Sequence, residues 1–368
     1  MLHFAFEVTY LLPVQQQVTM PCRGHVTTAI ELLQDSIPMV SLAVAAAALY
    51  ARASSSLLRP GLPRLIALLP LFPLLVAAPL AFPSSAIVRG LAAFFLAWLC
   101  TFKLALLAVG RGPLDPALPV LPFLFTALLP VKLAARASKA KPVSLVSCAV
   151  KVAVIAAVVR LYQFNDRLHL YARLALYGVH TYCFLDLLLP CIAAAAAALG
   201  MEAEPQFNRP YLASSLRDFW GRRWNLMVSA ILRPSVYDPV RALAGIPAAV
   251  LATFAVSALM HEAMVYYLSL QWRSDGMMAA FFLLHGVCCV VEGWCARRWP
   301  APPRAVATVL VGLFVTATSF WLFFPALCKD GVEEKLLQEW AAVAAFFQDA
   351  GGKIPWSMAC WSLVLWAS

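Results

Sequence analysis

The sequence predicts an all-α, polytopic integral membrane protein, and composition, run length and charge distribution each support that fold class. Hydrophobic residues make up 62% of the chain, charged residues only 12%, and the mean hydropathy is +0.80. Soluble domains are far less apolar. The apolar runs extend over most of the 368 residues, so we expect one transmembrane domain and no separate soluble module. Lys and Arg lie between those runs, so we interpret the net charge of +10 as a sign of membrane topology and of binding to anionic lipids or a phosphorylated substrate. This distribution does not indicate nucleic acid as the partner.

Eight membrane spans are expected. Their approximate ranges are 37–51, 65–82, 91–109, 143–159, 174–199, 242–271, 277–296 and 305–327. The stretch 117–131 is apolar, but it is short and contains Pro119, Pro122 and Pro130, so it is expected to be re-entrant or interfacial. Residues 1–36 are interpreted as a poorly defined N-terminal segment and residues 37–368 as the transmembrane domain, whose tail 354–367 is a further partial segment.

The basic residues divide unequally between the two sides of the membrane. If 117–131 does not span, the loops after the first, third, fifth and seventh spans lie on one side, and that side should be cytoplasmic. These loops carry the four strongest basic clusters, namely Arg52/Arg59/Arg64, Lys132/Arg136/Lys139/Lys141, the arginine-rich stretch 209–241, and Arg297/Arg298/Arg304.

The longest polar connection, residues 200–241, predicts a cytoplasmic amphipathic segment over 205–235. Ser215 with Asp218 forms a capping-box start, and Pro234 is expected to end the helix that follows. One face carries Leu216, Trp220, Trp224, Met227 and Ile231, and another carries Asp218, Arg222, Asn225 and Ser229. A helix of this kind commonly does no more than lie on a membrane surface.

His261 closes an uncharged run that begins at Ala242. An ionisable group in such a run is either functional or satisfied at the interface or by a neighbouring helix. An imidazole and the nearby carboxamide of Asn225 would suit acyl transfer, which needs a base and a donor to the developing oxyanion. Arg209, Arg222 and Arg223, with Trp220 and Trp224, are candidates for binding a nucleotide-bearing acyl donor.

The sequence predicts no metal site. His261-Glu262 begins like a zinc-protease motif, but Val265 occupies the place of the second histidine. No cysteine or serine lies in a nucleophile motif, so an acyl-enzyme is not expected. His285 is a secondary candidate, for which a packed and satisfied histidine is the commoner explanation.

One stretch of the chain, followed by an intramembrane His261, resembles the membrane-bound O-acyltransferase family. It reads Asp218-Phe219-Trp220-Gly221-Arg222-Arg223-Trp224-Asn225. Within that family the chain is similar to the plant wax synthases, which are long-chain-alcohol O-fatty-acyltransferases. Three further stretches carry the resemblance: Asn208-Arg209-Pro210-Tyr211-Leu212, His261-Glu262 with its tyrosines, and Phe282-Leu283-Leu284-His285-Gly286-Val287. It covers roughly residues 35–327 and is most specific over 205–290.

The resemblance implies many helices enclosing a catalytic chamber, with Asn225 and His261 in the family's catalytic positions. It implies direct transfer from acyl-CoA, as co-substrate and without a cofactor, to a long-chain alcohol within a multi-pass protein of the endoplasmic reticulum. The same chemistry on a sterol or a diacylglycerol is the alternative, and the sequence does not choose between these neutral lipids or define the oligomeric state. A transporter is less favoured, because no internal repeat is visible.

One difficulty concerns placement. If the sixth span begins at Arg241, His261 lies about 30 Å along a straight helix at about 1.5 Å per residue, far from Asn225. The catalytic assignment therefore predicts a later start near Pro247, a tilt, or an Asn225 helix that dips into the membrane.

Overall fold

The computed structural model describes residues 23–133, 145–272 and 274–351, and the regular structure within them is helical apart from one antiparallel bridge between Leu133 and Ala203. Seven helical stretches are long and apolar enough to span a membrane. A helix pair bent by 41°, Leu62–Leu68 with Leu71–Ala81, makes an eighth. The all-α polytopic fold is therefore confirmed. Residues 1–22 and the tail 354–367 lie outside the described residues.

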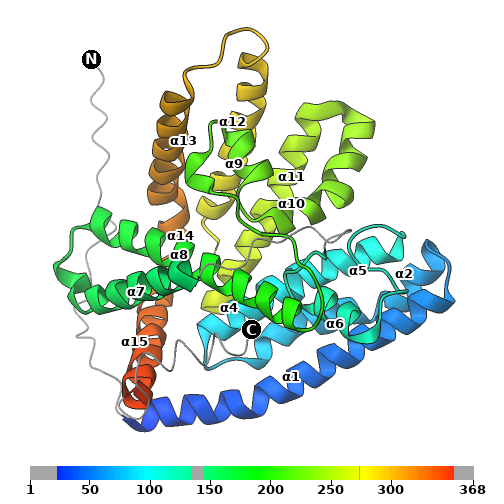
Figure 1. Ribbon diagram of the computed structural model, residues 1–368, viewed down its shortest axis with the longest axis horizontal. Helices are drawn as coiled ribbons and strands as arrows, with labels where there is room; N and C mark the ends of the chain where they lie inside the picture. The colour runs from blue at the N-terminus through cyan, green and yellow to red at the C-terminus, as the bar shows by residue number, and fades with distance from the viewer. Residues whose placement is uncertain (1–22, 134–144, 273, 352–368) are drawn as a thin grey trace.

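The elements follow one another along the chain as in Figure 1. The α-helices are α1 (Arg23–Leu57), α2 (Leu62–Leu68), α3 (Leu71–Ala77), α4 (Ala86–Ala92), α5 (Thr101–Ala108), α6 (Val120–Leu128), α7 (Leu145–Leu161), α8 (Leu170–Ala198), α9 (Leu216–Arg222), α10 (Leu226–Leu232), α11 (Asp238–Ser269), α12 (Met277–Cys295), α13 (Arg304–Thr318), α14 (Phe324–Leu327) and α15 (Val332–Gly351). Segments of 3₁₀ or π type join them: η1 (Ala78–Ala81), η2 (Ala93–Cys100), η3 (Tyr162–Arg167), η4 (Pro210–Leu212), η5 (Arg233–Tyr237) and η6 (Ser319–Phe323).

Contacts between loops join the described parts of the basic clusters, as the charge pattern predicted; Arg136, Lys139 and Lys141 lie outside the described residues. Arg64, which follows α1, donates to the carbonyl oxygen of Leu107 at the end of α5 at 3.0 Å. Lys132 pairs with Glu204 at 2.8 Å, which joins the loops after α6 and α8. Glu292, near the end of α12, accepts from the backbone N–H of Leu216 at 2.9 Å. Helix α6 has nine residues, too few to cross a bilayer, and so fits the expected re-entrant or interfacial segment.

The expectation of one amphipathic helix through Asn225 is wrong. Ser215 does cap a helix, because its hydroxyl accepts from the backbone N–H of Asp218 at 2.9 Å. That helix, α9, ends at Arg222, and α10 begins only after Asn225, which has left-handed backbone angles (φ 41°, ψ 66°). The apolar periodicity runs on through the break, so the pattern alone gave no sign of it.

Pro234 was expected to end the helix, but it does not. It lies in the π-helical segment η5, which leads directly into α11. The reversal comes at Gly245, whose angles (φ 82°, ψ −179°) interrupt α11 and lie in a region open essentially to glycine. Figure 1 shows the chain turning back within α11, and η5 contacts α11. Residues 226–244 and 246–269 thus form a helical hairpin, and its tip is exposed at Leu243 and Ile246.

The second arm of this hairpin is held between α12 on one side and α4 with η2 on the other. A Cβ on Gly286 of α12 would lie 2.8 Å from the Cβ of Phe254, and one on Gly90 of α4 would lie 2.8 Å from a Leu268 methyl carbon. Both glycines therefore permit close helix contact. The buried Arg89 guanidinium donates to the carbonyl oxygens of Tyr267 and Leu268 and so caps the end of α11.

Candidate active site

His261 lies on the second arm of the hairpin with one ring nitrogen occupied. Its Nδ1 is 2.7 Å from the carbonyl oxygen of Ser257, one turn earlier. A carbonyl oxygen only accepts, so Nδ1 carries the proton and donates it. The remaining nitrogen, Nε2, has no hydrogen-bond partner among the described residues, and the side chain is only partly buried. His261 therefore presents a free lone pair at Nε2, as a general base requires.

Two aromatic rings from different helices fix the orientation of this imidazole. Phe282 of α12 lies against it with ring centroids 4.0 Å apart and planes 31° apart. Trp98 of η2 contacts it edge-to-face at 5.0 Å and 78°. Glu262 takes no part, because its carboxylate accepts from Ser274 Oγ and from the backbone N–H of Ala279. The ring is thus positioned by packing and by Ser257, without a carboxylate partner.

Helix α12 gives the depth of the site relative to the polar connection. Glu292 of α12 accepts a hydrogen bond at the N-terminus of α9, and His285 of α12 accepts one from Trp220 of α9. Further along α12, Phe282 contacts His261. Ten residues separate Glu292 from Phe282, which corresponds to about 15 Å along a helix. Helix α9 therefore descends beside α12 toward the level of His261, as one of the three expected solutions required.

Asn225 lies where this descending segment turns into the first arm of the hairpin. Its carboxamide has no hydrogen-bond partner within the described part of the chain. Gly245 is 20 residues after Asn225 and 16 residues before His261, or about 30 Å and about 24 Å of helix. Because the two arms fold back on each other, these lengths put Asn225 and His261 at similar distances from the tip of the hairpin. The structure thus has both the late start of the span and the turn back of the Asn225 segment that the catalytic assignment allowed.

Helix α10 also packs against the segment η2, which carries Trp98. Met227 and Ile231 are fully buried and pack with Leu99 and Leu106 in one apolar cluster. Leu99 follows Trp98 in the same π-helical segment. The arm that begins at Asn225 and the ring that contacts His261 are therefore attached to one another.

His285 is engaged at both ring nitrogens and fully buried. The Trp220 indole N–H donates to its Nδ1 at 3.0 Å, so the proton resides on Nε2, which lies 2.9 Å from Thr318 Oγ1. Thr318 in turn donates to the carbonyl oxygen of Phe314 at 2.8 Å. With both nitrogens occupied, His285 links α9, α12 and α13 and has no free lone pair for a base.

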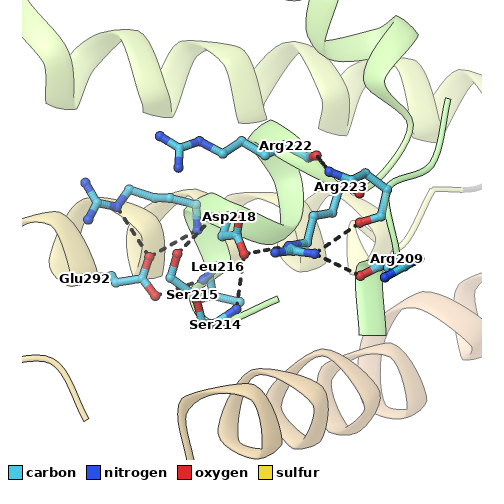
Figure 2. A network of polar contacts seen from close by, with 10 residues as sticks. Arg209, Ser214, Ser215, Leu216, Asp218, Arg222, Arg223 and Glu292 are labelled. Carbon is cyan, nitrogen blue, oxygen red and sulfur yellow. Dashed lines mark hydrogen bonds and ion pairs between the residues drawn. The ribbon is translucent and has the colours of Figure 1, made fainter. Parts of the chain in front are cut away.

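The three candidate arginines differ in what their guanidinium groups contact (Figure 2). Arg223 turns inward, donating to Asp218 Oδ2 at 2.6 Å and to the carbonyl oxygens of Asn208 and Arg209 at 3.2 and 3.3 Å. Arg222 and Arg209 are exposed, and within the described residues their guanidinium groups contact no acceptor. Arg209 and Arg222 are therefore available to an anionic ligand, whereas Arg223 holds the loop together.

The two candidate tryptophans are packed against protein aromatic side chains. Trp220 contacts Phe254, Phe281 and Phe282 as well as His285. Trp224 stacks on Phe219 at 5.5 Å and contacts Phe207 at 5.1 Å. Their rings stabilise the descending segment in this structure.

Sequence reasoning did not single out Trp98, Ser257 or Gly245. A tryptophan in an apolar span and a backbone carbonyl carry no local signal. Gly245 had one, since it stands two residues before Pro247, where a later start of the span was considered.

Comparison with known proteins places the chain in a family. Residues 203–284 match the family described as "Membrane bound O-acyl transferase family". Over 324 residues the chain is 37% identical to acyl-CoA--sterol O-acyltransferase 1 of Arabidopsis thaliana, covering 82% of this chain and 92% of that protein.

The chain belongs to the membrane-bound O-acyltransferase family. It is also 38% identical over 304 residues to the Arabidopsis thaliana protein named probable long-chain-alcohol O-fatty-acyltransferase 1, which covers 77% of this chain and 89% of that protein. The long-chain-alcohol O-fatty-acyltransferase of Simmondsia chinensis is 37% identical over 308 residues, with 77% and 87% covered. As a member of this family the protein is an acyltransferase that takes an acyl donor and a lipid acceptor.

Proposed function

We propose that this membrane-bound O-acyltransferase transfers the acyl group of acyl-CoA directly to a long-chain fatty alcohol and forms a wax ester. The observation that carries the proposal is the free Nε2 of His261, whose tautomer is fixed by the Ser257 carbonyl oxygen. Two relatives that are 38% and 37% identical to this chain are named probable long-chain-alcohol O-fatty-acyltransferase 1 and long-chain-alcohol O-fatty-acyltransferase, which supports a long-chain alcohol as the acceptor.

The chemistry requires one base and no acyl-enzyme. The alcohol O–H proton passes to His261 Nε2 as the hydroxyl oxygen attacks the thioester carbonyl carbon. The C–O bond forms, the C–S bond breaks, and the imidazolium returns its proton to the CoA sulfur. Asn225, with an unpaired carboxamide near the same depth, orients the substrate or stabilises the oxyanion.

The donor approaches from the side that carries the basic clusters, which we assign to the cytoplasm of an endoplasmic reticulum membrane. Arg209 and Arg222 are exposed there, have no acceptor among the described residues, and are positioned to bind the phosphates of CoA. The acceptor enters from the bilayer. Charge asymmetry supports this orientation, since positive loops are retained in the cytoplasm.

Packing around His261 favours a linear acceptor. Phe282 lies over the imidazole ring and the Trp98 ring contacts it edge-to-face, so aromatic side chains crowd the imidazole. A primary alcohol carries its hydroxyl at the end of a flexible chain and can reach a restricted edge. A sterol carries its hydroxyl on a rigid fused-ring body.

A sterol acceptor is the second candidate, because the relative matched over 324 residues is named acyl-CoA--sterol O-acyltransferase 1. One experiment separates the two. Yeast membranes from a strain without neutral-lipid synthesis, expressing the chain, receive labelled acyl-CoA with hexadecanol, a sterol or diacylglycerol. Wax ester as the main product supports the proposal, and sterol ester or triacylglycerol alone would overturn the acceptor assignment.

A further inference from the structure

The indole N–H of Trp98 is a buried donor without a partner at the side of the candidate base. Trp98 is 3% exposed, and its Nε1 has no hydrogen-bond acceptor among the described residues. A buried donor left unpaired is unfavourable, and native structures avoid it unless a water, a ligand or a reacting group provides the acceptor. Trp98 contacts His261 ring to ring at 5.0 Å, so this unpaired donor belongs to a side chain that packs directly on the candidate base.

The local backbone at Trp98 is unusual. Residues Ala93–Cys100 form a π-helical segment between two α-helices. Such segments rotate the side chains that follow, relative to an unbroken α-helix, and often mark functional sites. Phe94, one turn earlier, contacts the Trp98 ring edge-to-face at 5.3 Å and limits its rotation.

Hydrogen bonds of Arg89 also fix the position of Trp98 relative to His261. Arg89, nine residues before Trp98, donates to the carbonyl oxygens of Tyr267 and Leu268, six and seven residues after His261. The close approach at Gly90 lies beside it. Helices α4–η2 and α11 are thereby held in register, and the Trp98–His261 contact follows from that register.

We infer that the Trp98 N–H donates a hydrogen bond to the thioester carbonyl oxygen of the acyl donor and strengthens it as negative charge develops there. This inference rests on the proposed acyl transfer at His261. Two oxygens of the substrates are possible acceptors. A donor directed at the alcohol oxygen would weaken the nucleophile, whereas a donor directed at the carbonyl oxygen stabilises the transition state more than the ground state.

The test removes the indole N–H and keeps an aromatic ring at position 98. In Trp98→Phe, and in a variant with the isosteric 3-benzothienylalanine at position 98, kcat is expected to fall roughly 10²- to 10³-fold, with KM for acyl-CoA changed by less than about threefold. The benzothienyl ring preserves the contact with His261, so loss of packing does not explain a fall in that variant. Trp321→Phe, at a 68% exposed position, is the matched control and should keep the wild-type kcat.

A spectroscopic readout separates donation from packing. With ¹³C-labelled acyl-CoA bound to His261→Ala protein, the infrared carbonyl stretch should lie at lower frequency than in the double variant with Trp98→Phe. Equal frequencies, or a wild-type kcat in the benzothienylalanine variant, would overturn the inference. Failure of the proposed function is distinguishable, because it appears as no ester from wild-type protein with any acceptor.

Discussion

Trp220 and His285 share a hydrogen bond of 3.0 Å from the indole N–H to Nδ1. This bond places the His285 proton on Nε2, where Thr318 accepts it. In His261 the assignment is reversed, because Nδ1 donates to the Ser257 carbonyl oxygen. Two intramembrane histidines on adjacent helices thus hold opposite tautomers, and of these two His261 is the one with a ring nitrogen that has no hydrogen-bond partner among the described residues.

His285→Ala should weaken the fold and leave the base intact. The change leaves the Trp220 N–H without its acceptor in a buried cluster, which destabilises by about 1–3 kcal/mol. We expect a lower unfolding temperature in detergent and at least about a tenth of wild-type activity at low temperature, since His261 remains. Val287→Ala, at an exposed position on the same helix, is the control. Normal thermal stability with abolished turnover would make His285 a catalytic group instead.

Asn225 combines an unusual backbone with a free carboxamide, and Asn225→Gly separates the two. Glycine adopts the left-handed conformation without strain and so preserves the turn between α9 and α10. We expect normal insertion and a fall in kcat of roughly 10²- to 10³-fold, the range for loss of one oxyanion donor. Wild-type kcat in Asn225→Gly would show that the residue serves only the backbone.

The exposed arginines should affect donor binding, and Arg223 should affect stability. Arg209→Ala and Arg222→Ala are each expected to raise KM for acyl-CoA about tenfold, by loss of one charge-assisted contact. Arg223→Ala breaks the contacts with Asp218 and two carbonyl oxygens and should lower stability by roughly 2 kcal/mol.

Arg160→Ala is the matched control for charge, because Arg160 is exposed at the end of α7, away from the basic clusters. Initial rates against acyl-CoA concentration, with thermal unfolding, distinguish the variants. An unchanged KM in the Arg209→Ala, Arg222→Ala double variant would contradict the binding role.

The turn at Gly245 should be required for activity although it touches no substrate. A Cβ there meets no atom within 4 Å, so the effect of Gly245→Ala arises only from its positive φ. Strain of about 1–3 kcal/mol is expected, with reduced kcat because the arm carrying Asn225 shifts against His261. Gly312→Ala in α13 also meets no atom within 4 Å and lies in regular helix, where alanine is favoured. Equal activity and unfolding temperature in the two variants would contradict the hairpin.

Much of this arrangement is readable from residues alone. The spans follow from apolar run length, the one-sided grouping from Lys and Arg, and the start of α9 from Ser215. The break at Asn225 was not predictable, because Leu216, Met227 and Ile231 keep helical spacing through it and tertiary packing decides the backbone there. The contact of Trp98 with His261 was not predictable either, since the register between α4–η2 and α11 is set by Arg89 across more than 170 residues of sequence.

His261 is the base in the proposed acyl transfer to a fatty alcohol. The most direct measurement is the initial rate of wax-ester formation from labelled acyl-CoA and hexadecanol, in membranes containing equal amounts of inserted wild-type or His261→Ala protein. Loss of a base contributes roughly 10²- to 10⁴-fold, so ester formation by His261→Ala should fall at least about a hundredfold while acyl-CoA binding persists. Ester formation by His261→Ala at the wild-type rate would contradict the account.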